Sequence, residues 1–222
     1  MTAPPAPKLA VFDCDGTLVD GQAAVCAAAE AAFRAAGLAP PPRSAVRRIV
    51  GLSLPVAMRK LAPDEPAEIQ ARLVDGYRQQ FFRARSEGRV SEPLFEGIAE
   101  LLSGLHGGGW LLGVATGKSD RGLHGCLTGH GVFDLFTTLQ TADRHPSKPH
   151  PSMLQAALAE AAVEPDDAVM IGDTSYDVEM ARAAGVRALG VAWGYHAPEE
   201  LLAAGADAVA QDAAHLKELL NE

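Results

Sequence analysis

The sequence has 222 residues, of which 48% are hydrophobic and 21% charged, so it can bury a core and is not a disordered chain. The formal net charge is −9, from 28 acidic and 19 basic residues. This balance argues against a protein that binds nucleic-acid polymers or anionic membranes, because such a protein needs a basic face.

No membrane-spanning or targeting segment is predicted. No run of apolar residues approaches the ~18 needed to cross a bilayer. The Pro/Ala-rich residues 1–8 lack the pattern of a signal peptide, and we expect a short disordered tail there. The three cysteines are far apart and form no CxxC pair, which favours a reducing cytoplasm over a disulfide framework or a zinc site.

The first third of the chain predicts one strand followed by helices. The apolar run over residues 8–13 ends in an acid and is typical of a buried parallel strand. Ala-rich or amphipathic patterns follow, and no strand pattern occurs between residues 19 and 90. Helices are predicted over residues 18–36, 43–50, 54–61 and 66–85.

Strands and helices alternate in the rest of the chain. Strands are predicted over residues 110–116, 136–140, 168–171, 186–191 and 208–210, with helices over residues 97–105, 119–128, 151–162 and 175–184, then a short helix and a final helix. This alternation predicts an α/β fold with a Rossmann-like parallel sheet covered on both faces. Because the first strand precedes the helical block, we expect a core of residues 1–18 and 91–222 and an inserted all-helical domain of residues 19–90.

Polar side chains follow the predicted strands at the edge where active sites of such sheets lie. They are Asp13 and Asp15 after the first strand, Thr116 and Gly117 after the second, Lys148 before the helix that begins near residue 151, and Asp173 and Asp177 after the strand over residues 168–171. Each motif alone can be explained as a turn or a helix cap. Together they place several carboxylates in one crevice, which would be costly without a cation.

These residue types suit phosphate chemistry with a hard divalent cation. Mg²⁺ prefers oxygen ligands and pairs with phosphates, so it fits a cluster of carboxylates. The Lys148 ammonium, the Thr116 hydroxyl and backbone N–H groups at turns suit an oxyanion. Of Asp13 and Asp15, one could be a nucleophile and the other a general acid and base.

The motifs resemble those of the haloacid dehalogenase superfamily. The run DCDGTLVD over residues 13–20 is similar to its first motif, and three later stretches are similar to its second, third and fourth motifs: TGK at residues 116–118, Lys148 within SKPHP, and GDTSYD at residues 172–177. The predicted helical insert resembles the family's helical cap. TGKS at 116–119, SKPHP at 147–151 and WGYH at 193–196 resemble the phosphoglycolate phosphatase-like branch, although Gly21 stands where the family usually has Ser or Thr.

The resemblance implies a set of roles. Asp13 would attack phosphorus and form an aspartyl-phosphate, and Asp15 would protonate the leaving alkoxide and later deprotonate water. Mg²⁺ would be held by the Asp13 carboxylate, the Asp15 carbonyl and Asp173, with Asp177 orienting metal-bound water or binding the ion. Thr116, the Gly117 N–H and Lys148 would hold phosphoryl oxygens.

We therefore expect a cytoplasmic phosphatase that acts on a small phosphorylated metabolite, as a monomer or homodimer. The first candidate substrate is 2-phosphoglycolate. The alternatives are a sugar phosphate, pyrophosphate or nucleotide, or a non-catalytic module that binds a phosphorylated ligand. Asp15 argues against a dehalogenase, which lacks this acid. In the insert, Gln22, Arg47 and Arg48 are candidates to contact the substrate; the alternative is that their side chains only face solvent.

Overall fold

The computed structural model describes residues 8–221 and contains one parallel sheet of six strands in the order β3-β2-β1-β4-β5-β6. The strands are β1 (Leu9–Phe12), β2 (Leu111–Thr116), β3 (Thr138–Thr141), β4 (Ala168–Gly172), β5 (Arg187–Val191) and β6 (Ala208–Ala210). The sheet order changes direction at β1, which lies between β2 and β4. The predicted Rossmann-like α/β fold is confirmed. The predicted tail lies, apart from Lys8, outside the described residues.

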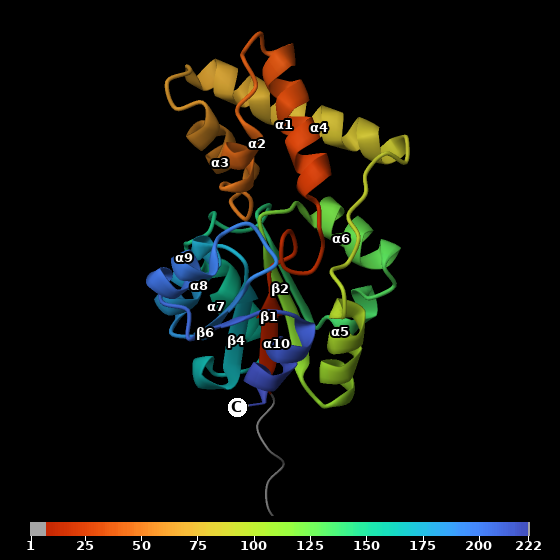
Figure 1. Ribbon diagram of the computed structural model, residues 1–222, viewed down its shortest axis with the longest axis vertical. Helices are drawn as coiled ribbons and strands as arrows, with labels where there is room; N and C mark the ends of the chain where they lie inside the picture. Colours follow the sequence, from red (N-terminus) through yellow and green to blue (C-terminus); the bar gives the residue numbers. More distant parts are fainter. Residues whose placement is uncertain (1–7, 222) are drawn as a thin grey trace, which may run out of the picture.

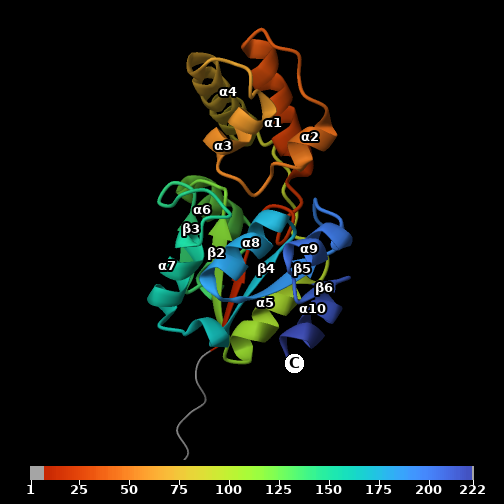
Figure 2. The same ribbon diagram turned by 90° about the vertical axis from the view of Figure 1, so that its left-hand side faces the viewer.

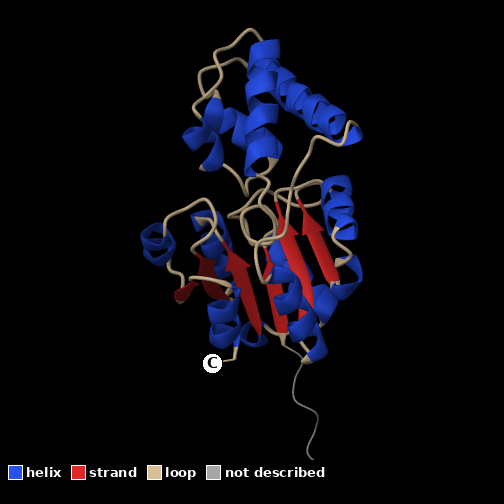
Figure 3. Cartoon of the chain, turned by 45° about the vertical axis from the view of Figure 1, so that its right-hand side comes forward, coloured by secondary structure: helices blue, strands red, loops and turns tan. Residues whose placement is uncertain are grey.

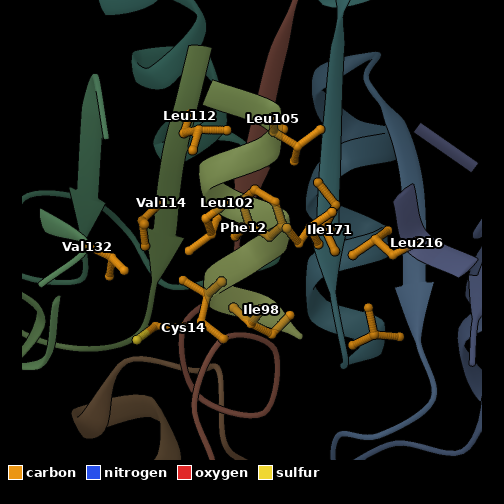
Figure 4. Close-up of a cluster of buried hydrophobic side chains, with 14 of the residues drawn as sticks. Phe12, Cys14, Ile98, Leu102, Leu105, Leu112, Val114, Val132, Ile171 and Leu216 are labelled. Atoms are coloured by element: carbon orange, nitrogen blue, oxygen red, sulfur yellow. The ribbon is translucent and has the colours of Figure 1, made fainter. Parts of the chain in front are cut away.

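Helices cover both faces of the sheet because β1 is apolar on both sides. Ala10 and Phe12 face a cluster formed with α5 (Ile98–Gly107), α6 (Asp120–Gly129) and α10 (Ala213–Leu220). Leu9 and Val11 face the opposite cluster, formed with α7 (Ser152–Ala161), α8 (Ser175–Ala184) and α9 (Pro198–Ala204). In Figure 4, Leu102 of α5 lies next to Phe12 in the first of these clusters. Two short 3-10 turns, Phe133–Leu135 and Pro165–Asp167, precede β3 and β4.

Four helices lie between β1 and α5 in the sequence and gather at one end of the molecule (Figures 1 and 2). We call them the helical insert: α1 (Gln22–Ala35), α2 (Arg43–Arg47), α3 (Leu54–Leu61) and α4 (Ala67–Ser86). They have their own small cores, one of which contains Phe33, Met58 and Leu73. The strands point toward the insert, so it stands over their carboxyl ends (Figure 3). No described helix is both long enough and apolar enough to cross a membrane.

The chain runs between the core and the insert twice, and the two connections are bonded to each other. Val19 forms a β-bridge with Leu94, the Asp20 N–H donates to the Pro93 carbonyl, and the Phe95 N–H donates to the Leu18 carbonyl. The first helix begins at Gln22 rather than near residue 18, because residues 14–19 form a tight turn instead. Gly16 has a φ of 88° in this turn, a left-handed conformation that glycine tolerates best.

Candidate active site

Three buried carboxylates and one buried lysine meet at the carboxyl ends of β1 and β4. Asp13 follows β1, while Asp173 and Asp177 lie at the β4–α8 junction. Lys148 Nζ lies 2.9 Å from Asp13 Oδ1 and donates to Asp177 Oδ1 at 2.6 Å. One oxygen from each of the three carboxylates lies within 4.8 Å of the other two. The structure thus brings together residues separated by up to 164 positions, from Asp13 to Asp177.

Asp15 faces a different set of partners. Its Oδ1 lies 3.0 Å from Lys118 Nζ, which also lies 2.6 Å from Glu92 Oε1. Glu92 in turn pairs with Arg85 at the end of α4. The Asp15 carboxylate therefore lies on the side toward the helical insert, and it is not part of the three-carboxylate cluster around Lys148.

The loop after β2 places the other predicted phosphate contacts. The Thr116 side chain is buried and its Oγ1 accepts from the Lys118 N–H at 3.3 Å. Gly117 follows, and a Cβ there would lie only 2.5 Å from the Leu52 carbonyl oxygen of the insert. Only glycine lets the two backbones approach this closely, which explains the residue type at this position.

Sequence reasoning missed several residues that hold the carboxylates. The Thr17 hydroxyl donates to Asp173 Oδ1 at 2.8 Å, and the Tyr195 N–H donates to Asp173 Oδ2 at 2.9 Å. Thr174 donates to Asp177 Oδ2 from both its hydroxyl and its N–H. Thr17 and Thr174 lie inside recognisable motifs, whereas no local pattern links Glu92 or the Tyr195 backbone to the site.

Burial and mutual repulsion raise the pKa of these acids. Burial raises the pKa of Asp13 to about 7, although Lys148 counteracts it. Burial, followed by the charges of Asp13 and Asp177, holds the pKa of Asp173 well above its usual range. Burial also raises the pKa of Asp15, against the opposing effect of Lys118. One lysine therefore cannot neutralise the negative charge of the three neighbouring carboxylates.

The cluster fits a divalent cation. Asp13 Oδ2 is buried and, among residues 8–221, has no hydrogen-bond partner. Mg²⁺ binds oxygens at about 2.0–2.1 Å, so ligands on opposite sides of the ion stand roughly 4 Å apart, close to the spread of this cluster. Asp13 offers the most available oxygen, because both oxygens of Asp173 and both oxygens of Asp177 already accept hydrogen bonds.

A cavity of about 870 Å³ opens beside these residues, between the helical insert and the core. Asp15, Gly117 and Lys118 contribute to its lining. The two predicted substrate contacts of the insert lie elsewhere: Arg47 Nη1 donates to Gln22 Oε1 at 3.3 Å, and neither residue lines the cavity. Arg48 instead pairs with Glu200 of the core.

Comparisons with known proteins agree with this geometry. The family model of haloacid dehalogenase-like hydrolases matches residues 10–191. The chain is 35% identical over 200 residues to a probable phosphatase, IndB, of Dickeya dadantii, covering 88% of this chain and 86% of that protein. It is 29% identical to a phosphoglycolate phosphatase of Vibrio vulnificus, with 96% of each chain covered.

A solved structure has the same fold. The crystal structure of a predicted phosphatase from Clostridium acetobutylicum superposes with a TM-score of 0.87 at 25% identity, covering 98% of this chain and 99% of that one. The match of the family model spans the four motifs, the sheet edge and the helical insert. The chain therefore belongs to the haloacid dehalogenase-like hydrolase family.

Proposed function

We propose that the protein is a Mg²⁺-dependent phosphatase that hydrolyses a small phosphate monoester through an aspartyl-phosphate on Asp13. The observation that carries the proposal is the Asp13 carboxylate itself: it is buried, it lies beside the Lys148 ammonium, and its Oδ2 has no hydrogen-bond partner within residues 8–221. The relatives named as phosphatases support the same class of reaction.

In the first step, an Asp13 oxygen attacks phosphorus as the bond between phosphorus and the ester oxygen breaks. Asp15 gives its proton to the leaving alkoxide, which a raised pKa favours because the carboxyl then carries a proton to give. In the second step, Asp15 takes a proton from water as the water oxygen attacks phosphorus, which releases phosphate and restores Asp13.

The other residues would neutralise and orient the phosphoryl group. Lys148, Thr116 and the Gly117 N–H would contact its oxygens, where fixed charges and donors stabilise the transition state. Asp13, Asp173 and the Asp15 carbonyl would hold Mg²⁺, with Asp177 positioning Lys148. When bound, the ion would offset the negative charge of the carboxylates and of the substrate.

The domain division belongs to the same proposal. Residues 19–90 would form a cap over a core of residues 1–18 and 91–222, of which residues 1–7 lie outside the described part. A cap that closes over the site would exclude water from the reaction. A cytoplasmic location is proposed from the acidic charge and from three cysteines that are buried free thiols.

The test is an Asp13→Asn variant assayed with p-nitrophenyl phosphate and Mg²⁺. We expect a loss of turnover of about 10⁴-fold or more, because an amide cannot act as the nucleophile. Asp166→Asn, at an exposed position outside the site, is the matched control and should keep full activity. Circular dichroism checks that both variants are folded. Turnover by a folded Asp13→Asn protein at the wild-type rate would refute the assignment.

A further inference from the structure

The cavity between the helical insert and the core is much larger than a two-carbon acid requires. Its volume is about 870 Å³, and Asp15, Gly117 and Lys118 lie in its wall, so it adjoins the candidate active site on the side of Asp15. Pockets on the order of 300–1,000 Å³ enclose drug-sized molecules. The glycolate part of 2-phosphoglycolate would leave most of this space unfilled.

The wall of the cavity is mostly apolar and partly aromatic. Tyr77, Phe81 and Phe82 project from α4, and the rings of Tyr77 and Phe81 are stacked with their centroids 5.9 Å apart. The core contributes polar side chains to the wall, including Arg121 and His124 of α6. The rest of the insert contributes aliphatic side chains: Val25, Ile49, Leu52, Leu54 and Met58. Such a surface binds an apolar body by removing it from water and gives little to a second charged group.

Phe82 adds an independent observation. It is 52% exposed, and in the described part of the chain only one other large hydrophobic side chain, Leu202, is exposed to this degree. Phe82 lines the cavity, and its ring lies 4.5 Å from the guanidinium carbon of Arg121, which belongs to α6 of the core. An apolar ligand that covered Phe82 would remove this exposed ring from water.

Three of the four lysine and arginine side chains in the cavity wall already have acidic partners, and the fourth, Arg121, lies over the Phe82 ring. Lys118 pairs with Asp15 and Glu92, and Arg85 pairs with Glu92. Arg78 lies 3.9 Å from Asp75. A substrate carboxylate near Lys118, Arg85 or Arg78 would therefore compete with existing ion pairs, and one near Arg121 would compete with the Phe82 ring.

We infer that the substrate is a phosphate monoester whose leaving alcohol is bulky, apolar and ring-bearing, with its ring against the Phe81 and Phe82 end of α4. The inference rests on the proposed function and specifies its substrate class. The step is the same: the bond between phosphorus and the ester oxygen breaks, a bond from phosphorus to Asp13 forms, and the apolar alcohol leaves with a proton from Asp15. Water then releases phosphate.

The experiment compares kcat/KM for three primary alkyl phosphates and for 2-phosphoglycolate, with Mg²⁺ present. The alkyl esters are ethyl, 2-phenylethyl and 2-(1-naphthyl)ethyl phosphate, whose leaving alcohols differ little in basicity, so that size and apolarity are the main variables. We expect kcat/KM to rise at least tenfold from ethyl to 2-phenylethyl phosphate, and 2-phenylethyl phosphate to exceed 2-phosphoglycolate. Acetyl phosphate is a small and reactive substrate that does not need to fill the cavity. Its hydrolysis therefore tests whether the protein is a phosphatase at all.

A variant at Phe82 tests whether this side chain causes the preference for the larger ester. Phe82→Ala should lower the ratio of kcat/KM for 2-phenylethyl over ethyl phosphate by at least threefold. Leu202→Ala is the matched control, because Leu202 is equally exposed but lies on α9 away from the cavity, and it should leave the ratio unchanged. Melting temperatures check that both proteins fold, and Phe81→Leu provides a second variant if Phe82→Ala is unstable.

The failures of the two proposals are distinguishable. If neither acetyl phosphate nor any ester is hydrolysed, the proposed function itself is wrong. If acetyl phosphate is hydrolysed but 2-phenylethyl phosphate is no better than ethyl phosphate, or 2-phosphoglycolate is the better substrate, the inference on substrate class is overturned and the phosphatase stands. A ratio that Phe82→Ala and Phe81→Leu both leave unchanged also overturns it.

Discussion

At the scale of single residues, the site concentrates negative charge at buried positions. Asp13, Asp173 and Asp177 are buried around the single ammonium of Lys148. Burying unpaired charge is costly, and the cost falls when a cation joins the cluster. The folded protein should therefore be more stable with the ion than without it, since any ligand that binds only the folded state stabilises that state.

This gives a prediction that does not depend on turnover. Mg²⁺ at about 100 times its Kd should stabilise the wild-type protein by about 2.7 kcal/mol, or roughly 5–10 °C in melting temperature for a protein of this size. Asp173→Asn should abolish most of this shift, because it removes one of the three buried carboxylate charges that the ion would offset. Asp166→Asn should keep it. A full Mg²⁺ shift in the Asp173→Asn protein would exclude Asp173 as a ligand.

Sequence patterns located most residues of the candidate site and few of their hydrogen-bond and ion-pair partners. Asp13, Asp173 and Lys148 could be recognised because each lies at a strand end or in a short motif. Glu92 could not, because its contact with Lys118 joins residues 26 positions apart through an ion pair that no periodicity encodes. The positions of Gln22 and Arg47 likewise depend on how the insert packs, and the structure pairs them with each other rather than with the cavity.

At the scale of elements, amphipathic patterns predicted the helices well and their ends less well. The helix over residues 175–184 has the predicted bounds, and Gly185 ends it with a φ of 73°. The first helix was predicted to begin four residues too early, because Leu18 and Val19 are apolar and match the helical pattern. Their hydrogen bonds to the Cys14 carbonyl belong to the turn that delivers Asp15 to the site, so tertiary context decided the boundary.

The packing of α5 on the sheet gives a prediction for stability. Leu102 is fully buried in the cluster around Phe12, so Leu102→Ala removes apolar contacts and leaves a cavity. Losses of about 2–5 kcal/mol in the free energy of unfolding are typical of such changes. Leu202→Ala, at a side chain 52% exposed, should cost less than about 1 kcal/mol. Urea titrations of the two variants would measure the difference, and equal losses would contradict the assigned packing.

At the scale of the whole molecule, an exposed ion pair joins the helical insert to the core. Arg48 donates to both carboxylate oxygens of Glu200, at 2.8 and 3.2 Å. The hydrogen bonds from Arg48 lower the pKa of Glu200 to about 2. The Tyr176 hydroxyl also donates to the Arg48 carbonyl, so this corner has several contacts across the interface.

Closure of the insert should therefore depend on pH in a predictable direction. Because the ion pair with Arg48 lowers the pKa of Glu200, it favours the arrangement of insert and core seen here above the usual glutamate pKa of 4.5, and this contribution is lost as pH falls toward 2. Glu200→Gln should make the protein more open at pH 7, seen as a larger radius of gyration by small-angle X-ray scattering. Glu199→Gln, on the same helix, is the control with an equal change in charge. Identical scattering from both variants would show that the ion pair does not hold the closed form.

The two connections between core and insert restrict how the molecule can open. Since Val19 bridges Leu94 and Asp20 bonds to Pro93, the connections form a single ribbon rather than two independent tethers. A rigid domain attached along one ribbon rotates about an axis near the attached edge. It cannot separate from the core by the same distance at every edge. The widest gap then forms at the edge farthest from the ribbon. If the insert moves in this way, contacts opposite the ribbon would break before contacts beside it, and a substrate would enter from the opposite edge.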